Sequence, residues 1–181
     1  DGPFNYAAIN NLGVRASRGE LVIFLNDSIE VLTSDWLERM GGYAQLPHMG
    51  AVGAKLLYPD AEVVQHVGVV NLLAGPGYGF SGLPAHGHGY FARAVLEYNW
   101  LAVTGACLMV ERSKFEHVGG FDEDFPASYY DMDLCFRLVE AGYYNLASPA
   151  VKLVNHGPYG FGSEQQVEFK REIQALYQKH P

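Results

Sequence analysis

Apolar residues along the chain follow two spacings, one typical of strands and one typical of helices. Residues 21–25, Leu-Val-Ile-Phe-Leu, are continuously apolar, which predicts a strand buried on both faces. Before it, residues 6–16 carry apolar side chains at helical spacing and end at a turn near Gly19. After it, residues 49–71 predict two strands joined by a turn at Pro59-Asp60.

The second half of the chain continues this alternation. Residues 74–89 are rich in Gly and Pro without a period, which predicts a long loop of the kind that often carries function. The other expected elements are a helix around Trp36, Leu37 and Met40 capped by Thr33 or Ser34, a strand at 99–111, a helix at 128–143 stopped by Gly142, a strand at 150–154 and a polar helix from Ser163. Strands that alternate with helices predict an α/β fold.

Composition and charge narrow the class of protein. The chain has 181 residues, enough for one domain with a sizeable core, and its net charge of -8 leaves no basic surface for nucleic acid. An anionic nucleotide would therefore need a metal ion or local hydrogen-bond donors. Cys107 and Cys135 lie in apolar surroundings, so we expect reduced core thiols.

The expected location is cytoplasmic, with peripheral association with the inner face of the membrane as an extension of that expectation. No apolar run approaches the roughly 18 residues of a membrane-spanning helix, and no signal peptide is recognisable. The chain opens on Asp-Gly-Pro without an initiator Met. We expect it to be part of a longer protein.

Acidic and imidazole side chains fall at the ends of the expected elements. Asp27 follows a strand, Asp131 and Asp133 open a helix, and His156 follows a late strand. Carboxylates and imidazole could hold a divalent cation that neutralises a diphosphate. Each acid also has a structural interpretation. Asp27 could start a turn, which spacing alone makes as plausible as a ligand. Asp131 could cap the helix and Asp133 could pair with Arg137, and for these two acids spacing alone favours the structural interpretation.

Several segments resemble family 2 glycosyltransferases with the GT-A fold, notably bacterial O-antigen and rhamnan-type enzymes. The segments are "FNYAAINNLGVRASRGELVIFLNDSIEV", "VGAKLLYPDAEVVQHVGVV", "TGACLMVERSKFEHVGGFDEDF" and "YYDMDLCFRL", which cover nearly the whole chain in order. The resemblance implies inverting transfer of a sugar from a nucleotide-sugar to an acceptor hydroxyl, on a glycan or lipid-linked acceptor of a cell-surface polysaccharide. It also implies that residues 1–181 are a single partial GT-A domain, with a mixed sheet that lacks the N-terminal nucleotide-binding strands.

The resemblance assigns roles to individual residues. Asp131 takes the place of the general base, and a helix N-terminus should keep it ionised. The family's second strand-end carboxylate, a metal ligand, falls on Ser28, so a Mn²⁺ or Mg²⁺ ion would be held weakly, by Asp27 and the late His156. The Glu before the base becomes Tyr130. The segment "GPYGFG" after His156 would be a mobile loop over the donor.

The remaining donor- and acceptor-binding residues are expected to be Asn26, Ser28, Trp100, Thr104, Gly105 and Asp133. Trp100 is equally a candidate core anchor. The fragment itself is expected to be inactive without the rest of its chain.

Two other functions stay open. Ser28 and Tyr130 are compatible with a degenerate GT-A domain that binds sugar or a partner domain without turnover. A metal hydrolase using His86, His88 and His156 would need a further carboxylate that the sequence does not locate.

Overall fold

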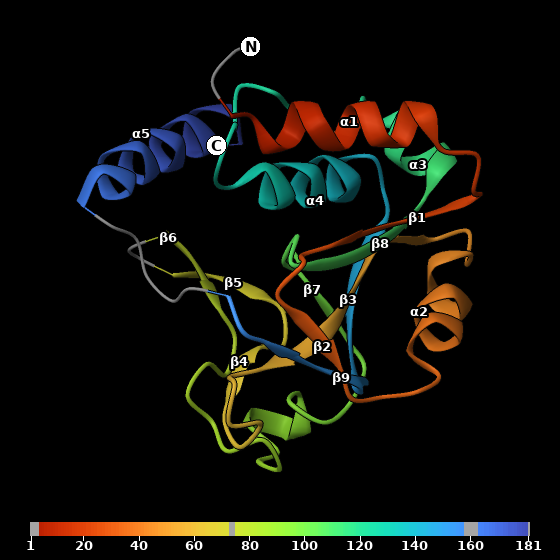
Figure 1. Cartoon of the computed structure of the whole chain (residues 1–181), viewed down its shortest axis with the longest axis vertical. Coiled ribbons are helices and arrows are strands. Elements are labelled where there is room, and N and C mark those ends of the chain that lie inside the picture. Colours follow the sequence, from red (N-terminus) through yellow and green to blue (C-terminus); the bar gives the residue numbers. More distant parts are fainter. Residues whose placement is uncertain (1–3, 73–74, 158–162, 181) are drawn as a thin grey trace.

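The computed structural model describes residues 4–72, 75–157 and 163–180, with the backbone alone for residues 163–169. Figure 1 shows the arrangement of its elements. In chain order they are α1 (Tyr6–Ala16), β1 (Leu21–Leu25), β2 (Ile29–Val31), α2 (Trp36–Ala44), β3 (Met49–Leu57), β4 (Val64–His66), β5 (Val69–Leu72), β6 (Gly75–Tyr78), η1 (Tyr90–Ala92), β7 (Tyr98–Trp100), β8 (Cys107–Glu111), α3 (Arg112–His117), α4 (Tyr130–Glu140), β9 (Tyr144–Asn155) and α5 (Ser163–Lys179).

A mixed sheet organises the molecule. In the described ranges it contains seven strands, in the order β1-β8-β3-β9-β2, with β4 paired to β3 and β7 paired to β9. The β3–β9 pair is parallel, whereas β8 and β1 run antiparallel to their neighbours. Strands β5 and β6 form a separate hairpin. The expected α/β class with a mixed sheet flanked by helices is confirmed.

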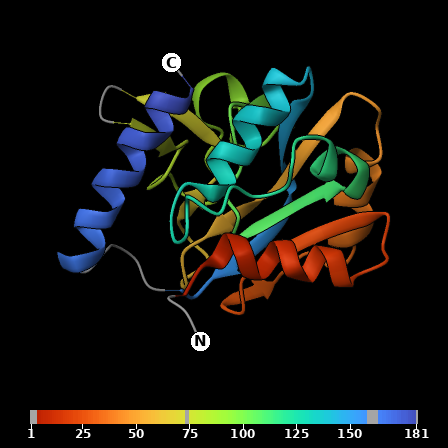
Figure 2. The same ribbon diagram turned by 90° about the horizontal axis from the view of Figure 1, so that it is seen from above.

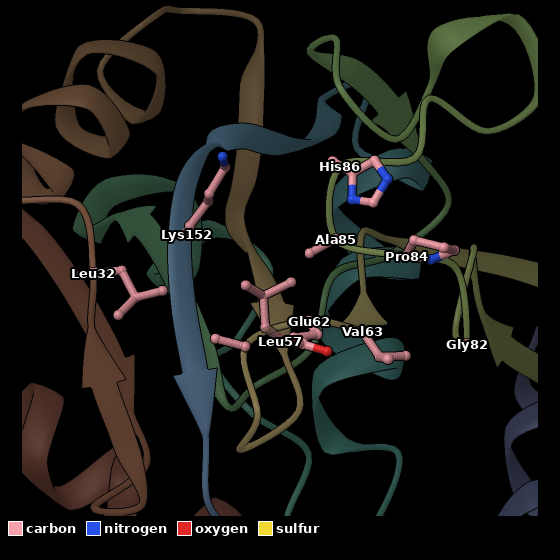
Figure 3. Close-up of a pocket in the computed structure, with 10 residues that line it drawn as sticks. Leu32, Leu57, Glu62, Val63, Gly82, Pro84, Ala85, His86 and Lys152 are labelled. Carbon is pink, nitrogen blue, oxygen red and sulfur yellow. The ribbon is translucent and has the colours of Figure 1, made fainter.

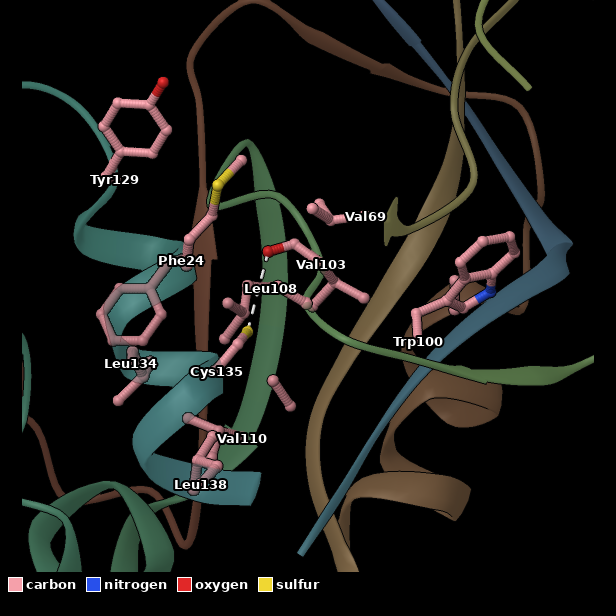
Figure 4. Packing of buried hydrophobic residues seen from close by; sticks show 14 of the residues in the cluster. Phe24, Val69, Trp100, Val103, Leu108, Val110, Tyr129, Leu134, Cys135 and Leu138 are labelled. Carbon is pink, nitrogen blue, oxygen red and sulfur yellow. Dashed lines mark hydrogen bonds between the residues drawn. The ribbon is translucent and has the colours of Figure 1, made fainter. Parts of the chain in front are cut away.

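Two apolar layers cover the sheet. Helices α1 and α4 lie on one side and α2 lies on the other (Figures 1 and 2). The α2 layer includes Met40, Val52 and Leu153. The larger layer on the α4 side includes Leu134 and Leu138 and is shown in Figure 4. Because β3 lies between the two layers, all nine of its residues are buried.

The burial expected for residues 21–25 is wrong, although the strand has the expected bounds. In the described part of the chain β1 pairs only with β8, so it is an edge strand. Phe24 is buried, but Leu21, Val22 and Ile23 are half-buried and Leu25 is exposed. Continuous burial on both faces belongs instead to β3.

Three other boundaries differ from expectation because tertiary contacts override local pattern. The expected strand at 99–111 is two strands, β7 and β8, with a turn between them. Residues 75–78, expected in a loop, pair with β5. Thr33 does not cap α2, whose N-cap is Asp35; the Thr33 hydroxyl accepts a hydrogen bond from Lys152 N at 2.9 Å.

Other expectations hold. The turn at Pro59-Asp60 joins β3 to β4, and Gly142, with φ of 91°, follows α4. Both cysteines are free and buried, and burial raises the pKa of Cys107 to about 12. None of the described helices combines the length and apolar character that crossing a bilayer requires.

Candidate active site

Asp131 lies in the first turn of α4, with its carboxylate enclosed by protein. Its side chain is buried, with 7% of the residue exposed. Gly105 N donates to Oδ2 at 2.6 Å, and Met132 N donates to Oδ1 at 2.8 Å. Burial raises the pKa of the Asp131 carboxyl, and these backbone donors offset only part of that effect. Desolvation thus acts against the helix terminus and the backbone donors, and it increases the affinity of Asp131 for a proton.

The turn between β7 and β8 brings its backbone against Asp131. A Cβ on Gly105 would lie 2.7 Å from the Tyr130 ring, so this position requires glycine. Thr104 is buried beside it, and its hydroxyl lies 3.1 Å from the Tyr78 hydroxyl. Tyr78 as a whole residue is 41% exposed, but its hydroxyl contacts the buried Thr104, and burial raises the pKa of Tyr78 to about 12. Tyr78 is thus a neutral hydrogen-bonding partner at physiological pH.

Asn26, at the end of β1, joins the same site through Tyr6. The Tyr6 hydroxyl donates to Asn26 Oδ1 at 3.2 Å, and the Tyr6 ring stacks on Tyr130 with centroids 4.5 Å apart. Asn26 N also donates to Ala106 O at 3.0 Å. We define the Asp131 cluster as Asn26, Thr104, Gly105, Tyr130 and Asp131.

A second group of side chains forms where β2 pairs with the end of β9. Ser28 Oγ donates to Asn155 Oδ1 at 2.9 Å, and His156 N donates to Ser28 O at 2.9 Å. The His156 ring bonds Glu30 through Nε2 and Oε2 at 2.7 Å, with the side chains 46% and 60% exposed. We define the His156 cluster as Ser28, Glu30, Asn155 and His156. Asp27 is exposed on the segment between the two clusters.

The sequence interpretation missed Glu30, although it lies only three residues after Asp27. Its link to His156 depends on the β2–β9 register, in which Ile29 faces Asn155. Tyr78 and Tyr6 were also missed as site residues, since their contacts join segments distant in sequence.

The side chains of the His156 cluster provide only some of the ligands that a divalent cation needs. Glu30 and His156 lie together and provide ligand types that Mn²⁺ accepts, but Ser28 contributes a hydroxyl that is bonded to Asn155. Within the ranges given above, no group of three or more His, Cys, Asp or Glu side chains is arranged to hold a metal ion.

Asp133 and Trp100 lie outside both clusters. Asp133 is fully buried and pairs with Arg137 at 2.5 Å, Lys179 at 2.6 Å and His180 at 3.0 Å, which ties α4 to α5. Trp100 is 7% exposed and packs in the core (Figure 4). These contacts support the ion-pair interpretation of Asp133 and the anchor interpretation of Trp100.

The cavity shown in Figure 3 is separate from both clusters. It has a volume of about 690 Å³ and contains His86 and Lys152. His156 is bonded to Glu30 instead, so the three histidines of the hydrolase hypothesis do not share one site. In the segment "GPYGFG", residues 158–162 lie outside the described residues.

Comparison with known sequences gives consistent matches. The sequence model described as glycosyltransferase-like family 2 matches residues 1–162. Protein y4gI of Sinorhizobium fredii is 43% identical over 180 residues, which is 96% of this chain and 20% of that protein. The O-antigen biosynthesis protein RfbC of Myxococcus xanthus is 41% identical over 163 residues, which is 86% of this chain and 12% of that protein. The chain thus spans a fifth or less of these two relatives.

A shorter match concerns an N-acetylglucosaminyl-diphospho-decaprenol L-rhamnosyltransferase of Mycobacterium tuberculosis. It is 38% identical over 78 residues, which cover 43% of this chain and 25% of that protein.

The fold of this chain resembles that of several solved structures. A mannosyltransferase from Pyrobaculum calidifontis, in complex with GDP-Man and Mn²⁺, has a TM-score of 0.62 at 16% identity and aligns with 96% of this chain and 42% of its own. GalNAc-T7, with UDP, GalNAc and Mn²⁺, has a TM-score of 0.63 at 12% identity and aligns with 84% of this chain and 30% of its own. At these identities the likeness concerns the fold, and it confirms the expected GT-A-like architecture.

Proposed function

Because the chain belongs to glycosyltransferase-like family 2, we propose that the protein transfers a sugar from a nucleotide-sugar donor to an acceptor hydroxyl, with Asp131 as the general base. The observation that carries this proposal is the buried Asp131 carboxylate, held by Gly105 N and Met132 N. Two backbone donors fix the carboxylate, and burial increases its affinity for a proton.

The proposed reaction is a single inverting displacement. The acceptor oxygen forms a bond to the anomeric carbon as the bond from that carbon to the diphosphate oxygen breaks. The hydroxyl proton passes to Asp131, and the nucleoside diphosphate leaves with the electron pair. The site favours a protonated carboxyl at the end of the reaction, because burial penalises the charged form.

A divalent cation would neutralise the diphosphate leaving group. Glu30 and His156 would hold it, with Asp27 from the adjoining segment, and Ser28 would be a poor ligand. Solved structures of similar fold that contain Mn²⁺ support the use of a divalent cation.

The substrate class follows from the relatives. Their names support a bacterial cell-surface polysaccharide such as O-antigen as the product, with a glycan or lipid-linked acceptor. We place the reaction in the cytoplasm, at the inner face of the membrane, and assign the nucleotide-binding strands to the remainder of a longer chain.

A non-catalytic binding domain is the second candidate function. Tyr130 and Ser28 supply neutral side chains where the resemblance implies carboxylates, and Tyr130 stacks on Tyr6 within the site. Under this hypothesis the same clusters would bind sugar without transfer.

Asp131→Asn in the full-length protein distinguishes the two. Asn retains the shape and removes the base, so turnover should fall by about 10² to 10⁴ with donor affinity retained. Nucleotide release and donor titration by calorimetry would measure this, with the exposed Asp124→Asn as the matched control. A folded Asp131→Asn protein with wild-type turnover would exclude Asp131 as the base.

A further inference from the structure

His66, at the end of β4, lies behind the turn that contacts Asp131. It is fully buried, and its Nε2 accepts hydrogen bonds from Gly68 N at 3.0 Å and from Thr104 N at 3.4 Å. Two N–H groups directed at Nε2 place the lone pair there and the proton on Nδ1. Burial lowers the pKa of His66 to about 3, so the ring is a neutral acceptor across the physiological range.

Thr104 is held from two directions. His66 accepts from its backbone N–H, and the Tyr78 hydroxyl lies 3.1 Å from its Oγ1. Tyr78 and His66 also contact each other, edge to face, with centroids 4.7 Å apart. The backbone entering Gly105 is therefore fixed by side chains from β4 and β6.

Gly105, which follows Thr104, connects this fixed backbone to the Asp131 carboxylate. Gly105 N donates to Asp131 Oδ2 at 2.6 Å, the shorter of its two backbone contacts. A glycine has no side chain to fix its own conformation, so the direction of this N–H depends on its neighbours. His66 is thus two hydrogen bonds and one peptide unit away from the proposed base.

His66 has a feature that packing alone does not explain. Its Nδ1 is buried and has no hydrogen-bond partner among the residues described. A buried unpaired donor is unfavourable, so an apolar residue would satisfy packing better at this ring position. The acceptor function of Nε2 is what an apolar residue could not supply.

We propose that His66 is a positioning residue that fixes the Thr104–Gly105 backbone and, through it, the orientation of the Asp131 carboxylate. The proposal rests on the proposed function, in which Asp131 takes the acceptor proton. It predicts that loss of the Nε2 acceptor impairs proton transfer more than donor binding.

The test compares His66→Leu with His66→Gln in the full-length protein. Leu removes the acceptor, whereas the Gln amide oxygen can occupy the place of Nε2. We expect His66→Leu to lower kcat by roughly 10- to 100-fold, because small displacements of a reacting group have such effects, with the donor KM changed less than about twofold. His66→Gln should recover most of the activity.

The pH profile provides the readout that a merely structural role would not move. The Gly105 N–H lowers the pKa of Asp131, so a misdirected N–H lets that pKa rise. Because the base must be ionised, the acid limb of kcat/KM should move to higher pH in His66→Leu and return in His66→Gln. If His66→Leu does not fold, His66→Asn gives the same test, since its shorter amide does not reach Thr104.

Met40→Ala is the control, because it opens a cavity in the α2 layer on the opposite side of the sheet. It should lower the melting temperature without moving the acid limb. Wild-type kcat and pH profile in folded His66→Leu would overturn the inference. Equal losses in Leu and Gln without a pH shift would also overturn it. If wild type transfers no sugar, or if Asp131→Asn is fully active, the proposed function is wrong. The inference about His66 is then wrong as well, because it depends on Asp131 as the base.

Discussion

The Asp131 cluster and the His156 cluster adjoin each other, yet they are built differently. Asp131 is 7% exposed and bonded by two backbone N–H groups. His156 and Glu30 are 46% and 60% exposed and are joined by one contact between side chains. The chain itself fixes the carboxylate that would take a proton. The Glu30 and His156 side chains face solvent, where they are accessible to a ligand or a cation.

Among the variants that test this difference between the clusters, Gly105→Ala should have the largest effect on activity and stability. The added Cβ would lie 2.7 Å from the Tyr130 ring and 3.2 Å from Asp131 Cβ, so the turn or the start of α4 must move. We expect turnover of the full-length protein to fall by about 10²-fold. We also expect a loss of about 1–3 kcal/mol of stability from overpacking. Activity assays and thermal unfolding would measure the two effects.

Gly42→Ala in α2 is the matched control, because its Cβ would meet nothing within 4 Å. It should leave activity unchanged and raise stability slightly, since Ala favours a helix over Gly. Wild-type turnover in Gly105→Ala would show that the site tolerates movement of this turn.

The difference between the clusters also explains what the sequence could predict. Asp131 lies at the start of an expected helix, so local pattern placed it at the end of an element and the family resemblance assigned its role. Its raised pKa comes from burial by segments distant in sequence, which no local pattern shows. The bounds of β1 were predictable from five apolar residues, but its edge position depends on which strands pair.

The contacts of His66, Tyr78 and Glu30 were not predictable for the same reason. His66 reaches Thr104 across 38 residues, and Glu30 reaches His156 across 126. The Glu30 contact depends on the β2–β9 register, and the His66 contact depends on how the turn before β8 packs against β4. An apolar run predicts that a strand exists, but not the partner that it faces.

The second prediction concerns the dependence of stability on pH. Because burial raises the pKa of Asp131, the folded protein binds this proton more tightly than the unfolded chain. The free energy of unfolding of wild type relative to Asp131→Asn should therefore fall as pH rises from about 4, the ordinary carboxyl value, through the folded pKa. Each unit of difference between the two pKa values corresponds to about 1.4 kcal/mol.

Cys135 in α4 is buried and becomes reactive when the protein unfolds. Pulsed labelling of this thiol in urea, at several pH values, would measure the free energy of unfolding in the full-length protein. The difference between the two proteins cancels the pH dependence of the labelling chemistry. A difference that stays constant with pH would contradict a raised pKa at Asp131.

Ser28→Asp tests the exposed His156 cluster and should increase its affinity for a divalent cation. A carboxylate beside Glu30 and His156 adds a hard oxygen ligand, so Mn²⁺ affinity should rise about tenfold, or about 1.4 kcal/mol. The gain is limited because the Ser28 hydroxyl now donates to Asn155 Oδ1, an acceptor that a carboxylate would face unfavourably. Manganese titration by electron paramagnetic resonance would measure it, with the exposed Ser113→Asp as control. Unchanged affinity would remove position 28 from the metal site.

His156→Ala should have the smallest effect on stability. An ion pair between side chains this exposed contributes about 0–1 kcal/mol, because water and salt screen it. The change in thermal unfolding should therefore be close to experimental error. In Ser28→Asp the same substitution should abolish the gain in Mn²⁺ affinity, because the imidazole ligand is lost. A large loss of stability would instead show that His156 holds the end of β9 in place, and the two clusters would then share one structural role.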